Sequence, residues 1–445
     1  MLPEITDLVR SGSLVRIPPS EDVPISDRVR RLIDTAPMRR LASIGQLGMV
    51  SLVYPGATHS RLEHTLGVYH NALRLLARFA QDDAFVALVP PAAAESFVLA
   101  ALVHDIGHWP FCHPIEDMRL PSLRPHESCV GDWLQMPELV TCIQQDWNSD
   151  IDAVLALLEP PSDGELEPPS QFLASCLSGP IDVDKLDYLQ RDSLHAGVPY
   201  GRNFDTGRLI NSLCVHPRQH RLAVGEKGRT AAEMMVFSRY VMFSEVYWHH
   251  AVRSATAMLQ RAVFLMQHRF DLEAALRFDD ARWIATLRRA AEGSVAEPLV
   301  EGIFGPRRRL YKRVAEFNVV DGREVHRRLA RRPYWWLVHC AERLASQLAR
   351  KTGTSVHASD ILIDAPPEKL EVDINMDVIS RDGSVHQLGE VSPVASALAN
   401  QQFDDHVKRV RVYAREEIRD NLRQRIADWG EELVASSEFV ENELV

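Results

Sequence analysis

A histidine and an aspartate stand side by side at His104 and Asp105, at the end of an apolar segment. The segment Ala92–Val103 is apolar nearly all round, which is typical of a buried helix. A buried carboxylate is costly unless it is paired or bound to a metal. Imidazole and carboxylate together suit divalent ions such as Mg, Mn, Fe or Zn, without selecting among them. The pair is therefore a candidate for part of a metal site.

Histidines are concentrated around this pair. Seven of the 18 histidines fall between positions 59 and 126, whereas a chain without a site there would scatter them. His108 follows His104 by four residues, so a continuing helix or a tight turn would place both on one side. Glu116 follows His113 by three residues, within its reach if that segment is helical. The clustering favours a chemical site over a chance dipeptide.

Composition limits the class of protein. The 445 residues carry a net charge of −11 and are 46% hydrophobic, as in a soluble globular protein with a large core. No run of about 18 apolar residues occurs, so we expect no membrane span. The acidic N-terminus does not resemble a secretory signal, and six cysteines lie singly. We therefore expect a cytoplasmic protein with reduced thiols.

The charge does not favour nucleic acid as a partner, although it does not forbid an anionic small substrate. The basic clusters at 307–309 and 327–332 are interpreted as solvated faces, with a nucleotide or nucleic-acid patch as the alternative.

Helical periodicity dominates the first 272 residues. Ser60 is a good N-cap, with Glu63 at the capping-box position. Four prolines predict a loop at 160–169. The segments 210–215 and 221–224 are expected to form a small hairpin. The predicted helices are 29–47, 61–80, 92–104, 170–192 and 230–267.

After about residue 272, charged helices alternate with short strand-like runs, and a charged helix is predicted over 404–434. The expected fold class is mainly α. It comprises a helical core over 1–272 and a smaller α+β region over 273–445 for oligomerisation or regulation. The predicted strands of that region are 309–317, 360–364, 371–379 and 384–390.

Four residues of the helical core match the pattern of a known family. The order His64, His104-Asp105, Asp184 matches the H…HD…D pattern of the HD-domain metal-dependent phosphohydrolases. The flanking segments resemble the deoxynucleoside triphosphate triphosphohydrolase branch, which includes the bacterial dGTPases and the sterile-alpha-motif-and-HD-domain enzyme. We expect this chain to lack the extra N-terminal domain of the latter. The segments that carry the resemblance are 54–68, 104–113 and 181–188, with 403–413 near the end of the chain.

The resemblance implies that His64, His104, Asp105 and Asp184 hold a divalent metal ion. Two imidazoles and two carboxylates leave room on the ion for water and phosphate oxygens. Such an ion polarises a phosphate and lowers the pKa of water. The simpler interpretation of Asp184 is a surface carboxylate on a charged helix, but the surrounding residues match the family.

His113 and Glu116 fit the family's catalytic pair. A carboxylate that holds an imidazole fixes its tautomer and raises its pKa, which suits proton transfer to the departing 5′-oxygen. His108, which we count with the catalytic set, and His126 resemble family positions that contact the phosphates. The simpler interpretations are that His113 caps a turn and that His126 begins a helix.

The resemblance also implies residues that bind the substrate. Arg61, Lys185 and Arg239 resemble phosphate-binding cations, although each alone would be interpreted as a surface charge. A tyrosine against the sugar 2′-carbon would exclude a ribose hydroxyl. The residues that resemble sugar contacts are Gln46, Leu47, Tyr188, Asp192 and, with weaker support, Tyr247.

One segment departs from relatives that guanine nucleotides activate. Asp34 is retained, but Arg39 and Ala42 replace the polar residues that the pattern leads us to expect. The sequence therefore leaves open whether an allosteric nucleotide binds with altered base preference or whether that site is absent. A homo-oligomer is implied by the resemblance alone.

The leading hypothesis is metal-dependent hydrolysis of deoxynucleoside triphosphates to deoxynucleoside and inorganic triphosphate. A different HD phosphohydrolase, such as a nucleotide phosphodiesterase, pyrophosphohydrolase or nuclease, fits the ligands but not the sugar-contacting residues. A dinuclear HD oxygenase would need further metal ligands. A nucleotide-sensing protein with little turnover would not need the pair His113 and Glu116.

Overall fold

The computed structural model describes residues 2–8, 13–19, 21–160, 166–367, 375–398 and 407–444. The chain forms two compact units that interleave along the sequence. The first unit comprises 1–109, 124–242 and 372–399, and the second comprises 110–123, 243–371 and 400–445. The expected domains, 1–272 and 273–445, are a different partition and stay a prediction.

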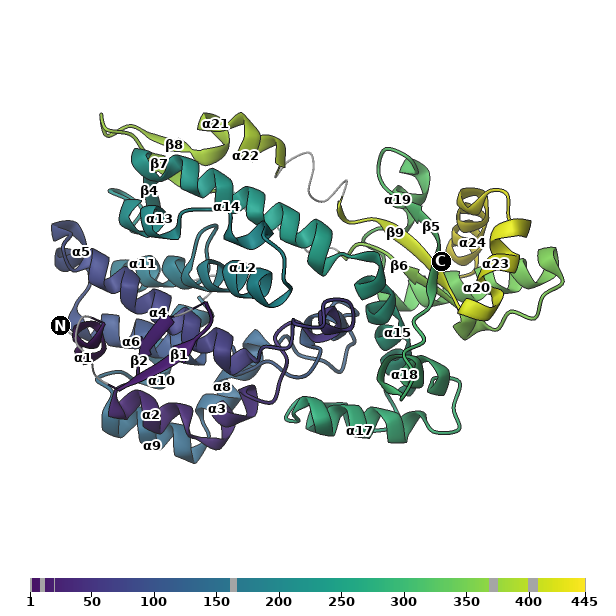
Figure 1. Ribbon diagram of the computed structural model, residues 1–445, viewed down its shortest axis with the longest axis horizontal. Helices are drawn as coiled ribbons and strands as arrows, with labels where there is room; N and C mark the ends of the chain where they lie inside the picture. Colours follow the sequence, from purple (N-terminus) through teal and green to yellow (C-terminus); the bar gives the residue numbers. More distant parts are fainter. Residues whose placement is uncertain are drawn as a thin grey trace. The chain divides into compact units, whose positions relative to one another are not determined.

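The first unit is mainly helical, as predicted (Figure 1). Its strands form an antiparallel pair, β1 (Leu14–Ile17) with β2 (Glu21–Pro24), and a four-stranded sheet. The order in that sheet is β3 (Leu213–Val215), β4 (Leu222–Gly225), β7 (Asp377–Ile379) and β8 (Val385–Gln387). The helices are α1 (Pro3–Asp7), α2 (Asp27–Ile33), α3 (Ala36–Leu41), α4 (Arg61–Phe79), α5 (Asp83–Leu88), α6 (Pro91–Val103), α8 (Val130–Leu134), α9 (Pro137–Asp146), α10 (Ile151–Leu158), α11 (Pro168–Leu177), α12 (Val183–His195), α13 (Thr206–Ser212), α14 (Arg229–Met242), α21 (Leu388–Val391) and α22 (Pro393–Ala397).

Helix α4 lies at the centre of the first unit and packs against both α6 and α12 (Figure 1). The second half of α6, Ser96–Val103, is buried throughout, which is why its sequence is apolar on every side. Ser60 caps α4 as predicted, because its side chain accepts a hydrogen bond of 3.2 Å from the Glu63 amide. The Glu63 carboxylate does not complete a capping box. Instead, the carboxylate forms hydrogen bonds with the side chains of Arg191 and His195 on α12.

Three long predicted helices are each divided in two. The segment 29–47 contains most of α2 and all of α3, and α3 begins at Ala36 with Pro37 as its second residue. The segment 170–192 contains α11 and α12, and Asp182 caps α12 by accepting a 2.7 Å hydrogen bond from the Lys185 amide. The segment 230–267 contains α14 and α15 with a π-helical turn between them. Capping side chains and prolines set these ends, which periodicity alone does not reveal.

The second unit combines helices with a three-stranded antiparallel sheet in the order β5, β9, β6. Buried residues of α20, β6 and β9 share one hydrophobic cluster, so this helix covers the sheet. The elements of the unit are α7 (Cys112–Glu116), a π-helical turn (Phe243–Tyr247), α15 (His250–Met266), α16 (Leu272–Ala275), α17 (Asp280–Ala291), α18 (Glu297–Phe304), β5 (Lys312–Phe317), α19 (Arg323–Leu329), α20 (Tyr334–Thr352), β6 (Ile361–Asp364), β9 (Val410–Ala414), α23 (Glu416–Arg425) and α24 (Trp429–Leu444).

The predicted helix over 404–434 is wrong. Residues 404–406 lie outside the described residues, Val410–Ala414 form β9, and α23 and α24 follow. All five residues of β9 are buried, because this strand lies between β5 and β6. A central strand favours β-branched and aromatic side chains, and that preference outweighs the helical pattern of the flanking residues.

The other predicted strands are found with shifted ends. The segments 309–317, 360–364 and 384–390 contain β5, β6 and β8, and the hairpin pairs Leu213 with Val224. Of 371–379, the part 371–374 lies outside the described residues and the rest contains β7, which pairs with β4 in the first unit. The predicted loop 160–169 ends in the first turn of α11, and 161–165 lie outside the described residues. Among the described helices, none combines the length and the apolar character needed to cross a membrane.

Gly67 allows α4 and α12 to approach closely. A Cβ atom at this position would overlap with Oδ1 of Asp187 and Nη2 of Arg191 on α12. Neither atom can move aside easily, because the side chains of Asp187 and Arg191 are both buried. A side chain larger than hydrogen at position 67 would therefore push the two helices apart.

We predict that Gly67→Ala destabilises the protein by about 1–3 kcal/mol through overpacking. In an ordinary helix, alanine would stabilise by roughly 0.5–1 kcal/mol relative to glycine, so the expected sign is reversed. Gly131→Ala in α8 is the matched control, because a Cβ there would lie 3.7 Å from Leu155 Cδ1, an ordinary contact. Urea unfolding midpoints measure both variants. A Gly67→Ala protein as stable as Gly131→Ala would contradict this account of the helix packing.

Candidate metal centre

The four predicted metal ligands come from three segments of the first unit. His64 lies in the first turn of α4, His104 and Asp105 follow α6, and Asp184 lies in the first turn of α12. Nε2 of His64 lies 3.0 Å from Oδ1 of Asp184 and 3.4 Å from Nε2 of His104. Nε2 of His104 lies 3.4 Å from Oδ1 of Asp105. Ligand atoms about 2.0–2.2 Å from one ion lie about 3 Å from one another. Ligand atoms of His64, His104 and Asp105 lie within 4.8 Å of one another and could hold a metal ion. Oδ1 of Asp184 borders this group, 4.0 Å from Nε2 of His104.

Hydrogen bonds at Nδ1 direct the other nitrogen of both histidines toward the same point. Nδ1 of His64 lies 2.8 Å from Oδ2 of Asp187, and Nδ1 of His104 lies 2.9 Å from the carbonyl oxygen of Ala101. Both partners are acceptors, so each Nδ1 carries the proton and a neutral ring keeps its lone pair on Nε2. Ligating histidines in proteins are held in this way. The donor set therefore fits a divalent ion.

The electrostatics of the centre attract positive charge. Burial alone would lower the pKa of His64, but hydrogen bonds to Asp184 and Asp187 outweigh it and raise the pKa to about 10. Burial alone would raise the pKa of Asp105, but the basic side chains around it, His108 foremost, hold that pKa well below its usual range. The carboxylates therefore stay ionised and draw a proton or a metal ion to the point where the donors meet.

A buried ion pair behind His64 was not predicted from the sequence. Arg191 donates from Nε and Nη2 to the two carboxylate oxygens of Asp187, at 2.9 Å and 2.7 Å. Burial alone would raise the pKa of Asp187, but Arg191 and then His64 lower it below its usual value. The signal in the sequence is an aspartate and an arginine four residues apart on the helix that carries Asp184.

Arg61, a predicted phosphate contact, lies beside the metal ligands. Its Nη1 donates a 2.8 Å hydrogen bond to Oδ2 of Asp105, and its side chain is buried. Its Nε is also buried and has no hydrogen-bond partner among the described residues. A buried donor without a partner is costly, and a ligand oxygen would satisfy it.

Two further predicted phosphate contacts, Lys185 and Arg239, are neighbours of Tyr188. Nζ of Lys185 lies 2.5 Å from Oδ2 of Asp182, and Nη1 of Arg239 lies 3.5 Å from the carbonyl oxygen of Pro180. Burial raises the pKa of Tyr188, and the charges of Arg239 and Lys185 act against that rise. Two cations and a tyrosine are thus grouped near Asp184.

The predicted sugar contacts Asp192 and Gln46 both meet His59. Oδ1 of Asp192 lies 2.9 Å from Nε2 of His59, and both side chains are buried. The backbone N–H of Gln46 donates a 2.9 Å hydrogen bond to the backbone carbonyl of His59. Oε1 of Gln46 is buried and has no partner among the described residues, which suits a ligand hydroxyl. Leu47 follows directly and precedes a short 3₁₀ helix, Gly48–Leu52.

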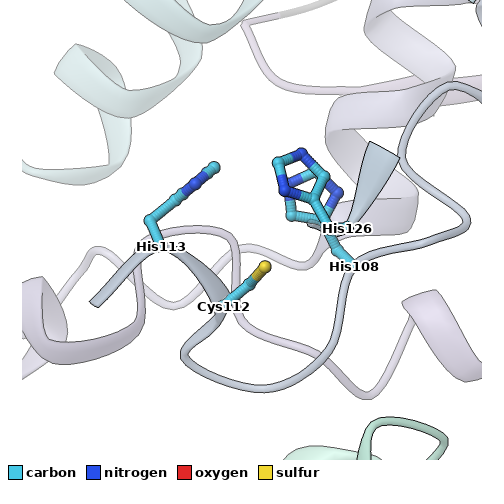
Figure 2. A group of neighbouring side chains, drawn as sticks. All are labelled: His108, Cys112, His113 and His126. Atoms are coloured by element: carbon cyan, nitrogen blue, oxygen red, sulfur yellow. The ribbon is translucent and has the colours of Figure 1, made fainter. Parts of the chain in front are cut away.

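His108 and His126 lie against each other (Figure 2). Their ring centroids are 3.8 Å apart, and Nδ1 of His108 lies 3.1 Å from Oδ1 of Asp105. The tight turn after His104, one of the two arrangements predicted, places His108 on this side. Gly107 makes the contact possible, because a Cβ there would overlap with the carbonyl oxygen of His126.

His113 and Glu116 lie on α7, which belongs to the second unit. The His113 side chain is 61% exposed, and its Nδ1 lies 3.8 Å from Oε2 of Glu116. Nε2 of Gln260 on α15 donates a 2.7 Å hydrogen bond to the carbonyl oxygen of Pro114, which ties α7 to this unit. Tyr247, also in the second unit, ends the π-helical turn. The proposed roles of these residues stay predictions.

Comparison with known proteins identifies the family. The sequence matches the HD domain over residues 61–130 and the HD associated region over residues 204–429. The chain therefore belongs to the HD-domain proteins that carry an HD-associated region. HD domains bind divalent metals, and the class of this protein is HD phosphohydrolase.

Individual proteins are similar to this chain over different lengths. An uncharacterized protein of Methanocaldococcus jannaschii is 28% identical over 91% of this chain and 79% of its own length. The human protein named deoxynucleoside triphosphate triphosphohydrolase SAMHD1 is 30% identical over 49% of this chain and 39% of its own length. The crystal structure of a hypothetical protein from Aquifex aeolicus superposes with a TM-score of 0.70 at 26% identity, covering 93% of this chain and 99% of that one.

We predict that Mn²⁺ stabilises the metal-stripped protein against thermal unfolding. An ion that binds only the folded state, present at 100 times its dissociation constant, contributes about 2.7 kcal/mol. Asp184→Asn should lose most of this gain. Asp420→Asn should retain it, because Asp420 is exposed, with 81% of its side chain accessible. Equal metal-dependent shifts in the two variants would show that Mn²⁺ binds elsewhere.

Proposed function

We propose that this protein hydrolyses deoxynucleoside triphosphates to deoxynucleoside and inorganic triphosphate. The main observation in support is that one unit contains both the candidate metal donors and buried polar atoms that lack a hydrogen-bond partner among the described residues. These atoms are Nε of Arg61, whose Nη1 bonds Asp105, and Oε1 of Gln46, whose backbone amide bonds the backbone carbonyl of His59. The first suits a phosphate oxygen and the second a sugar hydroxyl. The printed name of the human relative supports the same substrate class.

His64, His104, Asp105 and Asp184 would hold the metal in this proposal. The chemistry that a bound divalent ion supplies is polarisation of a phosphate oxygen and a lower pKa for water. Water attacks the α-phosphorus, the bond from that phosphorus to O5′ breaks, and the water oxygen stays with the triphosphate. The departing O5′ then needs a proton.

His113 would donate that proton from Nε2, while Glu116 holds the ring at Nδ1. A carboxylate in this position favours the protonated imidazole and fixes its orientation. The His113 side chain is 61% exposed, so a substrate could reach its ring. His108 and His126 would contribute hydrogen bonds to phosphate oxygens.

Arg61, Lys185 and Arg239 would bind the triphosphate, and Tyr188 would face the sugar 2′-carbon. A hydroxyl at that carbon would clash with the ring or lose its water, which selects deoxyribose over ribose. Asp192, Gln46, Leu47 and Tyr247 would complete the sugar site. A homo-oligomer and an activating second nucleotide are further proposals that rest on the family resemblance.

We predict that the protein with Mn²⁺ or Mg²⁺ releases inorganic triphosphate from dNTPs and much less from the matching ribonucleotides. Anion-exchange chromatography separates triphosphate from pyrophosphate, and mixtures of nucleotides test for activation. Asp105→Asn is the control for a contaminating hydrolase and should release nothing. Monophosphate and pyrophosphate as the sole products would instead identify a pyrophosphohydrolase.

We predict that His113→Ala lowers kcat by about 10²- to 10⁴-fold, the usual contribution of a general acid. Mn²⁺ and nucleotide binding, measured by calorimetry, should be unchanged. His339→Ala is the matched control, because Nδ1 of His339 lies 3.4 Å from Oε2 of Glu342 in the same i, i+3 arrangement on α20. Unchanged kcat in His113→Ala would remove this residue as the proton donor.

A further inference from the structure

His64 is held by a carboxylate that is not itself one of the proposed ligands. Its Nδ1 lies 2.8 Å from Oδ2 of Asp187, whereas Nδ1 of His104 is held by a backbone carbonyl. A carboxylate makes the imidazole a stronger donor toward a cation than a carbonyl does, because it stabilises positive charge on the ring. Asp187 is therefore connected to the proposed metal centre through its hydrogen bond to His64. Its position on α12 does not by itself require that bond.

Arg191 fixes Asp187 in turn. Its guanidinium forms two hydrogen bonds, of 2.9 Å and 2.7 Å, with the two carboxylate oxygens. The side chains of Arg191 and Asp187 are 1% and 3% exposed, so water contributes little to either charge. A bidentate pair of this kind restricts both the position and the plane of the carboxylate.

The guanidinium is anchored from two further segments. Nη1 of Arg191 donates to the carbonyl oxygen of Pro18 at 2.6 Å and to Oε1 of Glu63 at 3.0 Å. The same Glu63 oxygen lies 2.8 Å from Nε2 of His195. Gly67 on α4 leaves the space that the pair occupies. Arg191 is thus held by the loop before β2, by α4 and by its own helix.

We propose that Arg191 and Asp187 are positioning residues for the metal ligand His64. Together they hold the ring with its proton on Nδ1 and with Nε2 directed at the metal. The inference rests on the proposed metal centre but not on the identity of the substrate. Helix stability alone does not require such a pair, because a buried ion pair usually adds little stability over apolar side chains.

The test compares two aspartates that each form a buried bidentate pair with an arginine. In the second unit, Arg253 donates from Nε and Nη2 to the two oxygens of Asp364, at 3.1 Å and 2.5 Å. Asp187→Asn and Asp364→Asn both leave a buried arginine without its carboxylate, so both should lower the unfolding temperature. Only Asp187→Asn removes a carboxylate that holds a proposed ligand.

Mn²⁺ affinity of the metal-stripped full chain, measured by electron paramagnetic resonance of free Mn²⁺, separates the two effects. Asp187→Asn should bind Mn²⁺ about 10- to 100-fold more weakly than the unsubstituted protein, the usual effect of removing such a partner. Asp364→Asn should bind it normally. Should Asp187→Asn not fold, Asp187→Asn/Arg191→Gln removes the unpaired charge as well and should show the same weakening.

Unchanged Mn²⁺ affinity in a folded Asp187→Asn or double variant would overturn the inference, and so would equal weakening in Asp364→Asn. Failure of the unsubstituted protein to bind Mn²⁺ at all would remove the metal centre and this inference with it. Tight Mn²⁺ binding without triphosphate release would refute only the proposed substrate. The two proposals therefore fail in distinguishable ways.

Discussion

The burial of negative charge is the constraint on which the first unit depends. Asp105 and Asp187 are both buried among apolar helices, where an ionised carboxylate is unstable without a positive partner. Arg61 pairs with the first and Arg191 with the second. His64 lies between them, 3.9 Å from Asp105 and 2.8 Å from Asp187. Two permanent cations thus balance two anions, which leaves Nε2 of the imidazole available to a metal ion in the proposed centre.

Helix geometry brings these charges together. Helix α6 is buried through its second half and ends at Val103, so the polar residues begin where the helix stops. Ser60 and Asp182 fix the starts of α4 and α12, which places His64 and Asp184 in facing first turns. Gly67 sets how near these helices lie. Backbone capping and one missing side chain therefore determine the spacing of the donor atoms.

Adjacent polar residues at the end of an apolar helix are unusual, which is why the sequence points to His104 and Asp105; that they bind a metal ion stays a prediction. His104 and Asp105 stand out at the end of a buried helix, and the mainly α fold is confirmed. The supporting pair Asp187 and Arg191 was missed, because an i, i+4 ion pair normally indicates an exposed helix face. The strand β9 was also missed because its surroundings in the fold are not visible in the local sequence. Its central place in a sheet depends on β5 and β6, which lie far away in the sequence.

The interleaved units have a consequence for how the chain is made. Strand β4 pairs in parallel with β7, so Val224 meets Val378 within the first unit. During synthesis, β7 and β8 leave the ribosome only after most of the second unit. The four-stranded sheet of the first unit is therefore completed late, after a long loop has closed. A nascent chain stalled before residue 372 would hold β4 as an open edge, a target for chaperones.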